Sequence, residues 1–169
     1  MRKSILCTVI LLFTIIMIEN AILSNIAVLP VVPDLLMICI IYLGLLNGKI
    51  DGELSGFFSG MVQDFLSGVP FGFFMMLRTI LGYMGGFFHG SLHFRGIVMP
   101  AAIIFIATIS KCLIIWIMSL FFPHYVSTYN AISFSFLFEI ITNSVLAPLM
   151  FKVLSFFDRF LAFHKDNNE

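Results

Sequence analysis

Five charged side chains interrupt the hydrophobic stretches of this 169-residue sequence, and they are the groups most able to do chemistry: Glu19, Asp64, Arg78, Lys111 and Glu139. A charge at the middle of a helix in lipid costs at least about 2.5 kcal/mol, so each should face protein or water and have a partner. We expect Asp64 to pair with Arg78, and Lys111 to meet Glu19 or Glu139. Because three carboxylates face two bases, one carboxylate is either protonated or partnered by another chain.

Three roles are open for these intramembrane charges. They are ion pairs that only fix the register of the helices, the lining of a solute or proton path, or a docking site for a partner. For Asp64 a further alternative is to cap the turn at Ser67-Gly68. The ion-pair role makes the fewest assumptions, since burying either partner alone is costly.

Motifs for catalysis and for metal binding are missing from the sequence. His89 and His93 are four residues apart, a spacing that can bind a metal, but no third ligand stands nearby. No GxSxG, HExxH or P-loop pattern occurs, and nothing places a nucleophile, a base and an orienting acid together. Cys7, Cys39 and Cys112 lie in apolar runs without metal spacing. We therefore expect no enzyme, no metal and no cofactor.

Glycines recur every four residues between Gly44 and Gly72, and Asp64 stands in the gap of this pattern. Within residues 52–67 the spacing places small and polar side chains on one helix face: Gly52, Ser55, Gly56, Ser59, Gly60, Gln63 and Asp64. Lipid provides no hydrophobic drive between helices, so association depends on close backbone approach and hydrogen bonds. The face predicts a packing surface for a helix of the same chain or for a partner. Gly48 and Gly68 suit tight turns with positive φ.

The elements that position these residues follow from composition. The chain is 60% hydrophobic and only 11% charged, whereas soluble domains carry about 25% charged residues. We predict an all-α integral membrane protein with one domain, 1–169, folded as a six-helix transmembrane bundle. The predicted spans are 4–29, 34–47, 52–67, 71–90, 97–122 and 133–157. The second and third are short, so they either thin the membrane or form a helical hairpin packed inside the bundle.

Basic residues predict the orientation. With the N-terminus inside, six basic residues reach the cytoplasmic side: Arg2, Lys3, Lys49, Arg95, Arg159 and Lys165. The opposite loops, 30–33, 67–70 and 123–132, contain no Lys or Arg. Because cytoplasmic loops are enriched in these residues, both termini should be cytoplasmic.

Between residues 33 and 90 a series of short motifs follows one another: Pro33-Asp34-Leu35-Leu36, Tyr42-Leu43-Gly44, Asn47-Gly48, Gly52, Gly56-Phe57, Gly60, Gln63-Asp64-Phe65-Leu66-Ser67-Gly68-Val69-Pro70-Phe71-Gly72 and Gly82-Tyr83. With these motifs the stretch resembles the MreD family of bacterial rod shape-determining membrane proteins. Its turn residues are Pro33, Asp34, Gly68, Pro70 and Gly72.

This resemblance implies a non-catalytic scaffold of the cell-elongation machinery in the bacterial cytoplasmic (inner) membrane. It implies binding to MreC, and through MreC a link to MreB, RodA and a class-B penicillin-binding protein that build peptidoglycan. It also implies a fold similar to the S-components of energy-coupling-factor transporters.

That fold similarity leaves an alternative open, a vitamin-binding subunit of such a transporter. These subunits use small-xxx-small motifs to dock their coupling partner, and they need polar and aromatic side chains in the outer half. Here only one outer loop could contribute them, through His124, Tyr125, Thr128, Tyr129 and Asn130. The scaffold function is therefore favoured.

Overall fold

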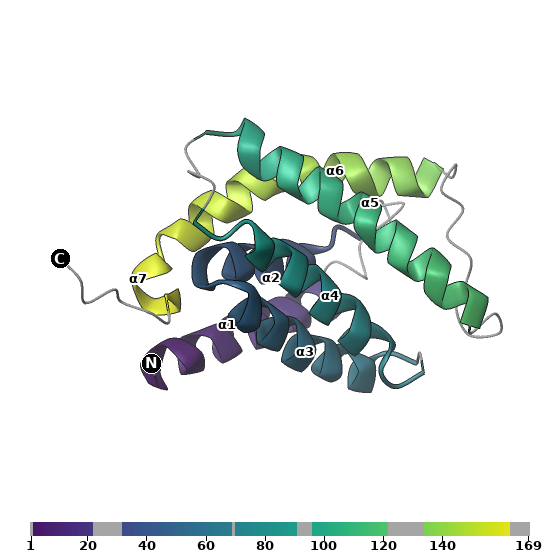
Figure 1. Cartoon of the computed structure of the whole chain (residues 1–169), viewed down its shortest axis with the longest axis horizontal. Coiled ribbons are helices and arrows are strands. Elements are labelled where there is room, and N and C mark those ends of the chain that lie inside the picture. The colour runs from purple at the N-terminus through teal and green to yellow at the C-terminus, as the bar shows by residue number, and fades with distance from the viewer. Residues whose placement is uncertain (1, 22–31, 69, 91–95, 122–133, 163–169) are drawn as a thin grey trace.

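The computed structural model describes residues 2–21, 32–68, 70–90, 96–121 and 134–162, and these residues form helices joined by turns (Figure 1). Seven helices follow one another along the described chain: α1 (Arg2–Ala21), α2 (Leu35–Asn47), α3 (Lys49–Leu66), α4 (Phe73–Phe87), α5 (Val98–Phe121), α6 (Phe134–Ser155) and α7 (Asp158–Leu161). The predicted all-α class is confirmed for this part of the chain.

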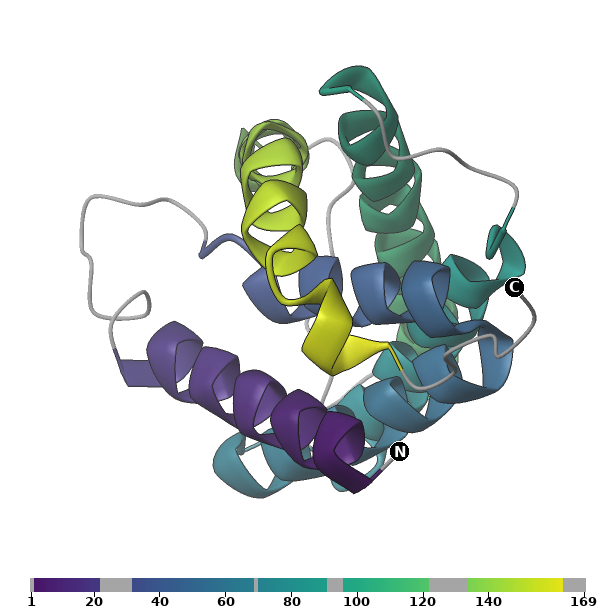
Figure 2. The same ribbon diagram turned by 90° about the vertical axis from the view of Figure 1, so that its left-hand side faces the viewer.

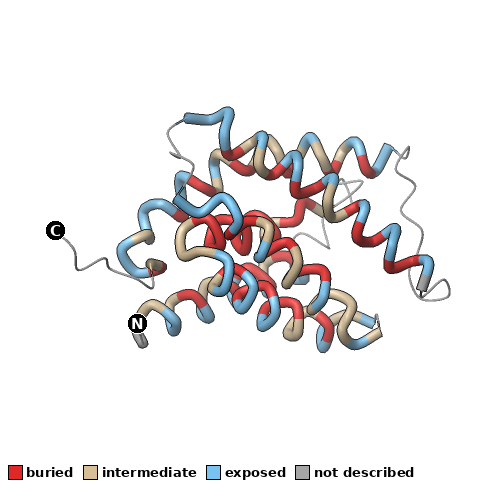
Figure 3. Tube along the Cα trace, viewed as in Figure 1, coloured by how far each residue is buried: buried red, intermediate tan, exposed pale blue. Residues whose placement is uncertain are grey.

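Helix α2 lies at the centre of the molecule. Every residue from Leu36 to Leu45 is buried, so the helix is covered on all sides. It contacts α1, α3, α4 and α6, and Figure 2 shows α6 above it and α1 below it. In Figure 3 the buried residues gather around this helix. A helix that is apolar all round is typical of such a position.

Helices α3 and α4 form a hairpin beside α2. Gly48 begins α3 with φ 100°, and Gly72 begins α4 with φ 101°. These left-handed conformations favour glycine because it has no Cβ. Gly68 is not among the described glycines with positive φ, so the prediction of such a turn holds for Gly48 and is wrong for Gly68. The sharp bend comes at Gly72 instead.

Helices α5 and α6 pack against each other, and the short α7 turns back across the end of the bundle (Figure 1). Two hydrogen bonds attach α7 to α2. The hydroxyl group of Tyr42 donates to the Asp158 carboxylate, and Asn47 Nδ2 donates to the Leu161 carbonyl at 3.0 Å. Burial raises the pKa of the Asp158 carboxyl group, and the hydrogen bond from Tyr42 opposes this shift.

Three of the described helices are long and apolar enough to cross a membrane, over Ser4–Ala21, Val98–Leu120 and Phe134–Ser155. Leu35–Asn47 and Phe73–Phe87 are apolar but shorter. The six predicted spans correspond to α1 to α6, except that 22–29, 122 and 133 lie outside the described residues. The seventh helix, α7, was not predicted, and the count of six crossings stays a prediction.

Candidate functional site

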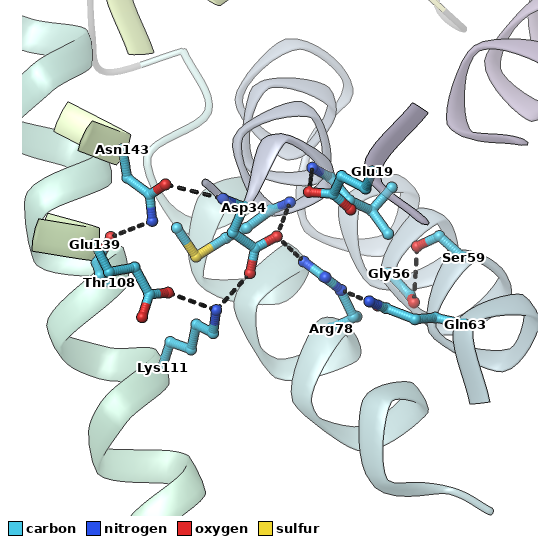
Figure 4. A network of polar contacts seen from close by, with 12 residues as sticks. Glu19, Asp34, Gly56, Ser59, Gln63, Arg78, Thr108, Lys111, Glu139 and Asn143 are labelled. Atoms are coloured by element: carbon cyan, nitrogen blue, oxygen red, sulfur yellow. Dashed lines mark hydrogen bonds and ion pairs between the residues drawn. The ribbon is translucent and has the colours of Figure 1, made fainter. Parts of the chain in front are cut away.

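The candidate site is a network of buried charged and polar side chains centred on Asp34 (Figure 4). Asp34 directly precedes α2, and its Oδ1 accepts a hydrogen bond from the Met37 backbone N–H at 2.9 Å, which caps the helix. The same Oδ1 lies 2.6 Å from Arg78 Nη1, and Oδ2 lies 2.7 Å from Lys111 Nζ. Asp34 is only 7% exposed. One buried carboxylate therefore forms ion pairs with two cations and also caps the start of α2.

The network continues outward from both cations. Lys111 Nζ also lies 2.7 Å from Glu139 Oε1, which links α5 to α6. Arg78 Nε donates to Gln63 Oε1 at 2.9 Å, which links α4 to α3. Because both cations are paired and hydrogen-bonded, their burial is compensated. Glu139 is the partner of Lys111, one of the two alternatives expected.

Asn143 and Thr108 complete the network on the side of α5 and α6. Asn143 Oδ1 accepts a hydrogen bond from the Asp34 backbone N–H at 2.9 Å. Its Nδ2 group donates to Thr108 Oγ1 at 3.5 Å. Both side chains are fully buried. They fix the segment before α2 against the outer pair of helices.

Glu19 attaches α1 to the same end of α2. Its Oε1 accepts a hydrogen bond from the Leu36 backbone N–H at 3.1 Å. Among the described residues, Glu19 forms no ion pair with Lys111 or with any other cation. The helices α1, α3, α4, α5 and α6 thus each contribute a side chain to the network. Helix α2 joins it through its N-terminal end, which Asp34 caps.

The predicted Asp64–Arg78 pair is wrong. The Asp64 carboxylate accepts hydrogen bonds from the backbone N–H groups of Gly72 at 2.9 Å, Phe74 at 2.8 Å and Met75 at 3.1 Å. The first N–H groups of a helix have no partner within the helix, so the carboxylate satisfies the start of α4. Arg78 turns toward Asp34 instead. The predicted cap at Ser67-Gly68 is also not what Asp64 does, although Ser67 Oγ donates to the Asp64 carbonyl at 3.4 Å.

The glycine face of α3 lies against α4 of the same chain. A Cβ added at Gly56 would lie 2.2 Å from the Arg78 carbonyl oxygen, and one at Gly52 would lie 2.4 Å from the Gly82 carbonyl oxygen. One at Gly60 would lie 2.5 Å from the carbonyl oxygen of Phe74. These distances are shorter than any real Cβ contact. The two backbones approach so closely that only glycine fits.

The other members of this face have separate contacts. Ser55 and Ser59 are buried, and Ser59 Oγ donates to the Ser55 carbonyl at 2.6 Å. Of the remaining turn residues, Pro33 accepts from the Leu35 N–H at 3.1 Å and Pro70 from the Phe73 N–H at 3.2 Å. Both bonds close a tight turn just before a helix, whereas the first helical bonds run to the Asp34 carbonyl from Ile38 N–H at 3.3 Å and to the Gly72 carbonyl from Met76 N–H at 3.0 Å.

A pocket of about 240 Å³ opens at the end of the bundle where α2 and α4 begin and α3 ends. Its lining includes four charged side chains of the network and two amides: Glu19, Asn20, Asp34, Gln63, Arg78 and Lys111. If the orientation predicted from the basic residues holds, this end faces the outside of the cell.

Asp34, the centre of the network, is not among the five intramembrane charges singled out from the sequence. Its position between Pro33 and an apolar run is typical of a turn at a membrane boundary, and the sequence therefore predicts only a turn residue of the family motif there. The five intramembrane charges contain more carboxylates than bases, so their balance does not indicate that a further carboxylate is needed. The sequence also does not predict the roles of Asn143 and Thr108 in the network. Each is a single polar residue in an apolar helix, and no repeated spacing marks it as part of a site.

No group of three or more metal-binding side chains occurs among the described residues. His89 Nδ1 lies 2.8 Å from the Leu45 carbonyl oxygen, and this contact fixes its ring at the end of α4. His93 lies outside the described residues, as does the outer loop considered for vitamin binding, 123–132.

Comparison with protein families decides the identity. The model of the MreD family, described as rod shape-determining protein MreD, matches residues 1–157 of the chain. The chain belongs to the MreD family.

The MreD match extends well beyond the 33–90 stretch on which the resemblance rested, and it includes every residue of the network. Members of this family are membrane proteins that determine rod shape, and the family is not known for catalysis. Among curated proteins no match was found, and none was found among solved structures.

Proposed function

We propose that this MreD-family chain is a non-catalytic scaffold of the cell-elongation machinery in the bacterial inner membrane. In this function it binds MreC and links it to MreB, RodA and a class-B penicillin-binding protein. The family match over residues 1–157 is the observation that carries the proposal.

The geometry supports a scaffold because the charged groups are used to join helices. Both cations of the network form ion pairs, and the Asp64 carboxylate is occupied by three backbone N–H groups. A catalytic site needs a nucleophile or base directed at a substrate, whereas these side chains are directed at one another. A bundle fixed in this way can present constant outer faces to partners.

The test is depletion of the protein in a rod-shaped host, followed by complementation. We expect depleted cells to round or widen while vitamin uptake is unchanged. Wild-type protein should restore the shape, and it should co-purify MreC from native membranes. Normal shape together with lost accumulation of one vitamin would support the transporter subunit instead.

A further inference from the structure

The pocket at the start of α2 contains two charged groups whose hydrogen-bonding capacity is incompletely used. Arg78 is 2% exposed, and among the described residues its hydrogen bonds are formed by Nη1 and Nε, so Nη2 donates to none of them. Glu19 is 8% exposed and uses Oε1 for the Leu36 N–H, so Oε2 accepts from none of them. Both side chains line the pocket. An unsatisfied polar group in such a setting is costly unless water or a ligand meets it.

The charge balance identifies what the pocket lacks. Asp34 and Glu139 form ion pairs with Arg78 and Lys111, whereas Glu19 forms none among the described residues. Three carboxylates thus stand against two cations. Asp34 and Glu19 both line the pocket, and of these two only Glu19 has no ion pair among the described residues. A positively charged hydrogen-bond donor would balance it. The guanidinium group of Arg78 offers its remaining N–H groups to an acceptor, and it prefers carboxylate and phosphate oxygens.

The position and size of the pocket limit the ligand further. Gln63 is three residues from the end of α3, and Phe74 is the second residue of α4. At 1.5 Å per residue these two lining groups lie within about 5 Å of the helix ends, whereas Lys111 lies about 15 Å from the nearer end of α5. The pocket therefore extends from the turn between α3 and α4 toward the middle of α5. Its volume of about 240 Å³ is below the range of about 300–1,000 Å³ typical of drug-sized ligands. The space suits a small polar group.

We propose that this pocket binds a small zwitterion, with a primary ammonium group on Glu19 Oε2 and a carboxylate or phosphate group on Arg78 Nη2. Two sources carry this chemistry, a free amino acid and the headgroup of phosphatidylethanolamine. No bond is made or broken, and the proposal does not depend on the scaffold function.

The full-length chain is purified and compared in two assays. In the first, native mass spectrometry follows lipid retained from nanodiscs of phosphatidylethanolamine, phosphatidylglycerol or phosphatidylcholine. Phosphatidylglycerol has no ammonium group, and the quaternary ammonium of phosphatidylcholine cannot donate a hydrogen bond. In the second, calorimetry measures the binding of glycine, L-alanine and L-glutamate. We expect selective retention of phosphatidylethanolamine if the source is lipid, and a binding isotherm with amino acids if the source is soluble.

Two variants and one control connect the binding to the pocket. Glu19→Gln keeps an oxygen for the Leu36 N–H and removes the charge, so it should weaken binding at least tenfold. Val32→Phe, at a lining residue outside the ion pairs, should narrow the pocket and weaken binding with those pairs intact. Glu53→Gln, an exposed carboxylate of α3 that does not line the pocket, should bind as wild type.

The proposal is overturned if wild-type protein retains the three lipids equally and binds no amino acid, since the pocket would then hold only water. It is also overturned if folded Glu19→Gln and folded Val32→Phe both bind as wild type. If Glu19→Gln does not fold, the binding measured for folded Val32→Phe alone decides whether the pocket is the binding site.

Discussion

At the scale of single residues, three carboxylates among the described residues have three different kinds of contact. Asp34 pairs with two cations, Asp64 satisfies backbone N–H groups, and Glu19 accepts from the start of α2 while part of its carboxylate faces a pocket. All three groups are carboxylates, but the partners that contact them differ. The effects of substituting them should therefore differ in size and in coupling.

Asp34→Ala should strongly destabilise the purified chain, because it leaves Arg78 and Lys111 without a shared partner. Removing one member of a buried pair typically costs about 3–5 kcal/mol. Unfolding of the detergent-solubilised protein measures this loss. In a double-mutant cycle, Asp34→Ala and Arg78→Ala should show a coupling of about 0.5–3 kcal/mol.

The matched cycle uses Asp64→Ala with Arg78→Ala. These two side chains have no ion pair or hydrogen bond between them in the described structure, so their effects should be close to additive. A coupling as large as that of Asp34 with Arg78 would restore the pairing predicted from sequence and contradict the observed network.

Asp64→Ala should destabilise the start of α4 by about 0.5–2 kcal/mol, the usual effect of losing a helix cap. Asp64→Asn should lose less, because one oxygen remains as an acceptor for the N–H groups of Gly72, Phe74 or Met75. Hydrogen exchange at these amides gives the direct measurement. Unchanged protection of Phe74 in Asp64→Ala would show that the carboxylate does not cap α4.

At the scale of elements, hydrophobic stretches predicted the helices well, since a helix in lipid must be apolar over its whole length. The predicted start of α3 was less accurate than the starts of the other predicted spans. It begins at Lys49 rather than residue 52, because its first turn is polar and outside any hydrophobic stretch. The partner of Arg78 could not be predicted from sequence. Asp34 is 44 residues away along the chain, and only the crossing of α2 with α4 brings the two together.

The glycine face gives the clearest test at this scale. Gly56→Leu should lower the stability of the isolated chain by at least about 1–3 kcal/mol, because the new side chain would meet the α4 backbone at Arg78. Gly68→Ala is the matched control, since a Cβ there meets no atom within 4 Å. Phe57→Leu, on the exposed side of α3, should also be mild. A Gly56→Leu chain that is stable alone but loses MreC would assign the face to the partner.

At the scale of the whole molecule, the basic residues predict the orientation of the chain in the membrane. In a chain whose native cysteines are replaced, Lys49→Cys should resist an impermeant thiol reagent in intact cells, because basic loops stay cytoplasmic. Phe71→Cys, an exposed position in the turn between α3 and α4, should react. Permeabilised cells provide the control, in which both should react. Labelling of Lys49→Cys in intact cells would reverse the orientation and place the polar pocket on the cytoplasmic side.

The central position of α2 also has a consequence for biogenesis. This helix of 13 residues spans about 20 Å, and its buried surface is supplied largely by helices that the ribosome makes later. Asp34 meets Arg78 and Lys111 only after 44 and 77 further residues have been added. Nascent chains that end before α5 must therefore keep an incompletely paired carboxylate and an uncovered helix within reach of membrane proteases. Synthesis of this protein should depend on insertion factors that shelter α2 until the remaining helices arrive.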